Sequence, residues 1–149
     1  MKHYLSTFLV AALATSPALA QFARDGNTTH PTRSALLGTL LPVGAFSITQ
    51  DHYTYETFKA LMDASVADYK RRCSAYEYLA WETRANTAQV VRDAFMTSAK
   101  LNGWEAKKQA DKGITQDYTF TKGKVTVFAR VTIPRYAREV YEIQLCHIK

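Results

Sequence analysis

The sequence contains none of the short motifs that mark the common enzyme classes. Its 149 residues include no G-x-S-x-G, no H-E-x-x-H, no C-x-x-C, no P-loop and no G-x-G-x-x-G. Such motifs place an activated serine, a catalytic zinc, a redox dithiol or the phosphates of a nucleotide. Their absence argues against each of these chemistries, and we expect no cofactor and no metal site.

Long apolar runs are missing as well, except at the N-terminus. No other segment approaches the roughly 20 residues that a membrane-spanning helix needs, which excludes a multi-pass membrane protein. The chain starts with a basic segment around Lys2, continues mostly apolar to Leu13, and has small residues at Ala18 and Ala20. This pattern predicts a secretory signal peptide over residues 1–20. We expect a protein exported to the periplasm or the medium, with no transmembrane segment in the mature chain.

Cysteine is scarce, with Cys73 and Cys146 as the two examples. In an oxidising compartment, two thiols in one small domain most often form a disulfide. This bond would close a loop of about 73 residues and contribute about 4 kcal/mol to stability. The alternative is two separate buried thiols. Neither cysteine has neighbours at the spacing of a metal site.

The remaining composition is that of a globular protein. Apolar residues make up 47% of the chain and charged residues 21%, which argues against a disordered or repetitive chain. Residues 21–35 are polar and carry Gly26 and Pro31 without periodicity, so we predict a flexible leader. Residues 36–149 are predicted to form a single α+β domain.

Two segments of this domain have helical periodicity. Tyr55, Phe58, Met62 and Val66 recur at helical spacing after Thr54 or Asp51, either of which is a suitable cap. A second helix is predicted over residues 86–101, ending at Asn102-Gly103. Between the two helices, residues 74–82 fit either a strand, because of their aromatic side chains, or a continued helix; we favour the strand.

After Gly103 the apolar residues alternate, which predicts an antiparallel meander. The expected strands are 104–109, 117–121, 124–133 and 138–147, with Thr121 opposite Lys124. Odd-numbered side chains from Val125 to Ile133 are apolar, so we expect an α+β fold with two helices packed on one face of a four- to five-stranded sheet. This alternation turns Cys146 away from the helices, so its pairing with Cys73 requires either a bulge in the last strand or a segment after Cys73 that wraps around an edge of the sheet.

The positive charge is concentrated in the meander. The formal net charge is +6, and the excess of basic residues lies beyond residue 99. Cations with interspersed aromatic rings on the open, even-numbered face suit a polyanion. A further cluster, Lys70-Arg71-Arg72, is interpreted mainly as the solvated end of the first helix. The candidate ligand-binding residues are Lys122, Lys124, Phe128, Arg130, Arg135, Tyr136 and Arg138.

Candidates for catalysis are few. General acid–base catalysis requires side chains such as those of His52, Glu56 and His147, with Glu139 or Glu142 as further carboxylates. Arg130 or Arg135 could stabilise a phosphate. Together they would suit a metal-independent hydrolase such as a ribonuclease. Nothing in their spacing indicates that they meet.

Three functions therefore follow as hypotheses. The one we favour is an exported binding domain, not an enzyme, that holds a polyanion or an envelope component on the basic sheet face. The alternatives are the secreted hydrolase and a structural envelope protein without a ligand. Dense tyrosines at residues 53–55 and 76–81 indicate core and edge packing, or alternatively a contact for a carbohydrate or a protein partner.

Overall fold

A computed structural model describes residues 27–82, 85–133 and 140–149. The predicted signal peptide and the candidate residues Arg135, Tyr136, Arg138 and Glu139 lie outside these ranges. Within the described ranges, no helix is long and apolar enough to cross a membrane. The elements are β1 (Thr28–Thr29), β2 (Ser47–Ile48), α2 (Tyr55–Ala67), β3 (Cys73–Glu82), α3 (Ala85–Leu101), β4 (Glu105–Asp111), β5 (Thr115–Lys122), β6 (Val125–Thr132) and β7 (Val140–Ile148).

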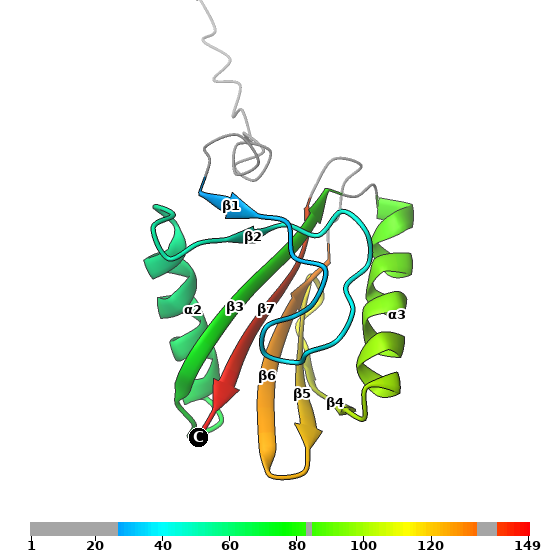
Figure 1. Cartoon of the computed structure of the whole chain (residues 1–149). Helices are drawn as coiled ribbons and strands as arrows, with labels where there is room; N and C mark the ends of the chain where they lie inside the picture. Colours follow the sequence, from blue (N-terminus) through cyan, green and yellow to red (C-terminus); the bar gives the residue numbers. More distant parts are fainter. Residues whose placement is uncertain (1–26, 83–84, 134–139) are drawn as a thin grey trace, which may run out of the picture.

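The five longer strands form one antiparallel sheet in the order β3-β7-β6-β5-β4 (Figure 1). The α+β class, the two helices and the C-terminal meander are confirmed. The ambiguous segment before α3 is a strand, and it pairs with the last strand of the chain. The short strands β1 and β2 pair with each other as a separate sheet.

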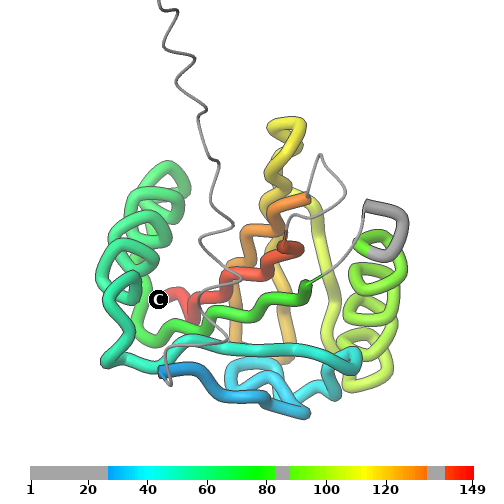
Figure 2. Tube along the Cα trace, turned by 90° about the horizontal axis from the view of Figure 1, so that it is seen from above, coloured from blue at the N-terminus to red at the C-terminus, as the bar shows by residue number. Residues whose placement is uncertain are grey.

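The two helices pack on opposite faces of the sheet, which corrects the predicted one-sided arrangement (Figure 2). Phe95 of α3 lies against the odd-numbered side chains of β6 and β7, including Val127 and Ile143. Met62 of α2 lies against the even-numbered face, with Phe128. That face carries enough apolar surface in the middle of the sheet to form a second core, which the mixed polar pattern of its sequence obscured.

The predicted disulfide is present. Cys73 and Cys146 are bonded, with their Cα atoms 5.5 Å apart. The pairing of β3 with β7 shifts register between Cys73 and Ala75, so the irregularity is in β3 and not in the last strand. The bulge in the last strand was expected only because both helices were placed on the odd-numbered face. Because α2 covers the even-numbered face, Cys146 is on the same side of the sheet as the helix that ends just before Cys73.

Residues 27–35, the described part of the predicted leader, are packed on the domain instead of detached from it. Thr28 and Thr29 form β1, and Ser34 is buried. The Glu77 carboxylate accepts hydrogen bonds from Ser34 Oγ at 2.6 Å and from the amides of Ala35 and Leu36 at 2.7 and 3.0 Å. This buried side chain therefore holds the segment against β3.

Two glycines set the turns that flank the meander. Gly103 has φ +83° and closes α3, with the Trp104 amide donating to Ala99 O and the Gly103 amide to Lys100 O. Gly123 has φ +60° and is the first turn residue between β5 and β6. The observed pair flanking this turn is Lys122 with Val125, not Thr121 with Lys124. This shift keeps every side chain on its predicted face.

Candidate functional site

Two of the predicted ligand-binding residues are part of the structural core. Phe128 is 1% exposed and packs against Tyr69, with ring centroids 5.5 Å apart. Arg130 is paired with the directly opposite Asp117, through Nε to Oδ1 at 2.8 Å and Nη2 to Oδ2 at 3.0 Å. Arg130 also donates to Ser65 of α2. Burial under α2 removes both residues from the open surface on which the sequence analysis placed them.

The electrostatics of this pair fit a structural role. Burial acts to raise the pKa of Asp117, but the hydrogen bonds and charge of Arg130, with Lys112 Nζ 3.5 Å away, lower it below its ordinary value. The pKa of Arg130 is raised by the same partner. Asp117 therefore stays ionised and Arg130 is committed to it, so Arg130 is not available to a ligand.

The predicted open face does exist, but on the outer half of the sheet. Helix α2 covers β3, β7 and part of β6, and a hollow of about 160 Å³ lies between the end of α2 and strands β4 to β6. Val66 and Phe128 are the buried apolar side chains of this hollow. Its other lining residues are Tyr69, Arg71, Gln109, Thr119, Thr126 and Ile148.

The polar lining of the hollow is set by strand register. Thr119 of β5 lies opposite Lys107 of β4 and Phe128 of β6, so these three side chains share one face. The β4 register shifts between Lys108 and Ala110, which leaves Gln109 as a bulge residue. Gln109 Nε2 donates to Thr119 Oγ1 at 2.7 Å. The result is a hydroxyl and amide surface beside an apolar floor.

Cations gather at the same end of the molecule, where α2 and α3 end, the β5–β6 turn lies and the chain terminates (Figure 1). The Lys149 amide donates to Arg72 O, which brings the C-terminus next to the basic cluster after α2. We call this region the basic end. Its cationic residues are Lys70, Arg71, Arg72, Lys100, Lys107, Lys122, Lys124 and Lys149, and the acidic residues beside them are Asp68 and Glu105.

The cations of the basic end differ in their contacts from all the described cations elsewhere except Arg33. Lys59, Arg92, Lys108, Lys112 and Arg130 each form an ion pair with a carboxylate. Across residues 27–82, 85–133 and 140–149, no cation of the basic end forms one. Lys122 instead donates to Asn102 O at 2.7 Å and lies over the Trp104 ring. The basic end is therefore a region of uncompensated positive charge.

The structure does not bring the catalytic candidates together. His52 is buried before α2, where its Nδ1 lies 2.9 Å from Thr54 Oγ1. Glu56 is exposed and pairs with Lys59. His147 lies on β7 opposite Ala75, beyond the other end of the 13-residue helix α2, and its Nδ1 contacts Ser74 Oγ at 2.9 Å. These contacts form no acid–base pair.

One other carboxyl group is perturbed. Burial raises the pKa of Glu142, although the hydrogen bonds of Tyr78 and Gln144 act in the opposite direction. Gln144 Nε2 donates to Glu142 Oε2 at 3.2 Å. Glu142 is on β7 near residue 140, well away from the hollow at the basic end, so it takes no part in that site. In the described part of the chain, no group of three His, Cys, Asp or Glu side chains could hold a metal ion.

Most of the lining of the hollow was not predicted from the sequence. Lys70-Arg71-Arg72 was predicted as a secondary basic cluster, but not as a neighbour of the meander. The signal for that placement was the cysteine pair itself, because a Cys73–Cys146 bond brings Arg71 to the last strand. No sequence feature indicated that Gln109, Thr119 and Thr126 line a hollow. An isolated polar residue on a strand is common on any solvent-exposed sheet face.

Comparison with protein-family models, with curated proteins and with solved structures finds no match to this chain.

Proposed function

We propose that this protein is an exported binding domain that holds an anionic polysaccharide at its basic end. The observation that supports this most strongly is the difference between its two sets of cations: five of the six described cations elsewhere are ion-paired, and those of the basic end have no carboxylate partner among the described residues. Uncompensated charge around a concave surface attracts a ligand of opposite charge. The disulfide fits an oxidising compartment, and the signal peptide pattern supports export.

The lining of the hollow favours a sugar polymer over a nucleic acid. Arg71 is exposed at the rim and offers a planar donor array that matches a sulfate or carboxylate. Gln109, Thr119 and Thr126 offer donors and acceptors that match sugar hydroxyls. Single-stranded nucleic acids also need aromatic rings on which bases stack. Phe128 is buried here, and the half-buried Tyr69 packs its ring against Phe128 and donates its hydroxyl to Asp117.

The test is the affinity for a heparin octasaccharide, measured by isothermal titration calorimetry at several salt concentrations. The informative variant is the triple substitution Arg71→Ala, Lys107→Ala and Lys124→Ala. Its matched control removes the same charge elsewhere, through Arg33→Ala, Arg92→Ala and Lys108→Ala. We expect the first variant to lose at least tenfold in affinity and to show a shallower salt dependence, and the control to lose less than threefold.

Other outcomes contradict the proposal. Equal losses in the two triple variants would mean that net charge, and not the hollow, sets the affinity. Tighter binding of a single-stranded RNA of equal charge would mean that the ligand is a nucleic acid and not a polysaccharide. Cleavage of either polymer would support the alternative of a secreted hydrolase. If heparin does not bind even at low salt, the remaining hypothesis is a structural envelope protein without a ligand.

A further inference from the structure

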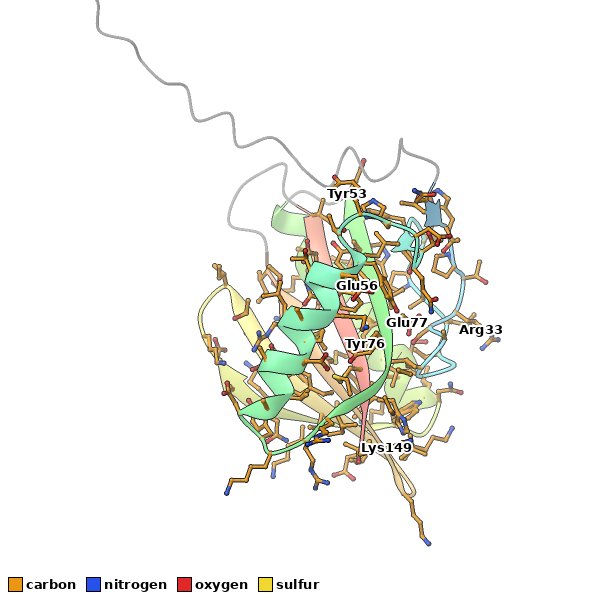
Figure 3. All side chains as sticks on the ribbon, turned by 90° about the vertical axis from the view of Figure 1, so that its left-hand side faces the viewer. Arg33, Tyr53, Glu56, Tyr76, Glu77 and Lys149 are labelled. Carbon is orange, nitrogen blue, oxygen red and sulfur yellow. A yellow bond between two sulfur atoms is a disulfide. The ribbon has the colours of Figure 1, made fainter. Side chains whose placement is uncertain are left out.

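A second groove runs along the edge of the sheet, beside β3 on the side away from β7. Two adjoining hollows of about 260 and 610 Å³ form it, and both are lined by Gln50, Tyr55 and Tyr76. Figure 3 looks onto this edge, with Glu56 of α2 above Tyr76 and Arg33 farther to the right. The groove shares no lining residue with the hollow at the basic end.

The floor of the groove is strand backbone. The amide and carbonyl of Ala80 both bond to Phe46, so these groups point away from β7. Orientation alternates along a strand, and the amide and carbonyl of Tyr76 therefore point outward as well. Within the described ranges, no backbone group pairs with them. The chain thus uses this edge for antiparallel pairing at Ala80 and leaves it open at Tyr76.

The wall on the α2 side is aromatic and held in place. Tyr76 OH donates to Asp63 Oδ1 at 2.6 Å, and Lys59 Nζ lies 5.5 Å from the centre of the Tyr76 ring. Tyr55 lines the same wall and packs edge-on against Phe58. This wall offers a half-buried apolar surface to a side chain that enters the groove.

The opposite wall carries positive charge. Arg33 is exposed and lines the first hollow, and its Nη1 donates to Gly38 O at 3.1 Å, which leaves the other donors of the guanidinium available to a ligand. The residues that follow Arg33 are fixed to β3 through Glu77, whose carboxylate is already satisfied by three donors. Arg33 therefore sits on a fixed segment and has no ion pair with a described residue.

We propose that this groove binds an extended polypeptide segment, which pairs antiparallel with β3 at Tyr76 as Phe46 does at Ala80. An exposed strand edge is complementary to another strand, because both present alternating donors and acceptors at the same spacing. Opposite residues in such a pair share a face. The segment residue opposite Tyr76 is apolar and packs against Tyr55 and Tyr76, while its neighbour is acidic and faces Arg33.

The experiment titrates the ¹⁵N-labelled protein with acetyl-Val-Glu-Val-Thr-Val-amide and follows its amide signals by NMR. Two control peptides carry one N-methyl group each. Methylation of the central valine removes the donor that would bond to Tyr76 O, whereas methylation of the threonine affects an amide that faces solvent. We expect the first control to bind at least tenfold more weakly than the parent and the second to bind within threefold of it.

Arg33→Ala tests the charged wall separately. In the natural protein, replacing the glutamate of the peptide with glutamine should weaken binding about threefold, and in the variant it should have no effect. Equal binding of the two methylated peptides would overturn strand pairing, as would signal changes confined to Arg71 and Gln109. Absence of binding at millimolar peptide would overturn the proposal while leaving the basic end untouched.

Discussion

The buried pair of Asp117 and Arg130 shows how one contact changes the interpretation of a residue. From the sequence, Arg130 is a cation on an exposed strand face. In the structure, two hydrogen bonds to a fully buried carboxylate and a third to Ser65 tie β5, β6 and α2 together. A cation held in this way contributes to stability and not to ligand binding.

Asp117→Asn should lower the free energy of unfolding by about 2–3 kcal/mol, because it leaves the partly buried Arg130 without its counter-ion. Urea denaturation at pH 7 measures this loss. Glu56→Gln is the matched control, since it also removes a paired carboxylate, but one whose side chain is 79% exposed. A similar small change in both variants would contradict the structural role of the buried pair.

The difference between Asp117→Asn and the natural protein should also depend on pH. The pKa of Asp117 is lowered in the folded state, so its contribution is complete above its unfolded pKa of about 3.9 and is lost as the pH falls through the folded value. Asparagine does not titrate. The two stability curves should therefore converge below about pH 4, and a constant difference from pH 6 to pH 2 would contradict this account.

Tyr141→Phe should be neutral or stabilising by up to about 1 kcal/mol, because the Tyr141 hydroxyl is buried and has no hydrogen-bond partner among the residues that the structure describes. Ser34→Ala is the comparison, since it removes a buried hydroxyl that donates to Glu77 and should cost about 1–2 kcal/mol. Thermal and urea denaturation measure both. A loss for Tyr141→Phe as large as that for Ser34→Ala would indicate an unrecognised partner.

At the scale of elements, periodicity predicted the strands and helices well. The alternation of Val127, Ala129 and Val131 correctly predicted which side chains share a face. The hairpin register differs from the predicted one by two residues, so this assignment of faces is unchanged. The face on which α2 packs could not be predicted the same way. On the even-numbered face, the apolar residues Phe128 and Cys146 are interspersed with the polar residues Arg130 and Gln144. The sequence pattern therefore does not indicate a second apolar core, which is visible only in the burial of Phe128 and Cys146.

The end of α3 depends on one glycine. Gly103→Ala should lower the free energy of unfolding by about 1 kcal/mol, because φ +83° is unfavourable for a residue with a Cβ atom. The space around the position is sufficient, since an added Cβ would meet Lys122 Cε at 3.6 Å. Gly103→Asn tolerates this backbone better and should lose less. Equal losses in urea denaturation would point to packing and not to backbone conformation.

At the scale of the whole molecule, long-range pairing decides the site. The pairing of β3 with β7 places the basic residues after α2 next to the C-terminus and near the β5–β6 turn. The meander alone does not predict this, because β3 precedes it by an entire helix. The cysteine pair was the sequence feature that indicates this proximity, and the charge excess beyond residue 99 indicated the basic residues that the meander contributes to the basic end.

The disulfide should contribute about 4 kcal/mol, since it closes a loop between residues 73 positions apart. The double variant Cys73→Ala and Cys146→Ala should lose this amount in urea denaturation at pH 7. The reduced natural protein should behave like the variant, which controls for the changed side chains. Equal stability of the oxidised and reduced forms would contradict a constraining bond.

Chemical-shift mapping with a sulfated heparin disaccharide tests the basic end most directly. The account predicts that the largest amide shifts of the labelled protein fall on Arg71, Lys107, Gln109 and Thr119, and that they disappear in Arg71→Ala. Shifts spread over the whole surface, or centred on Arg33 and Arg92, would contradict it.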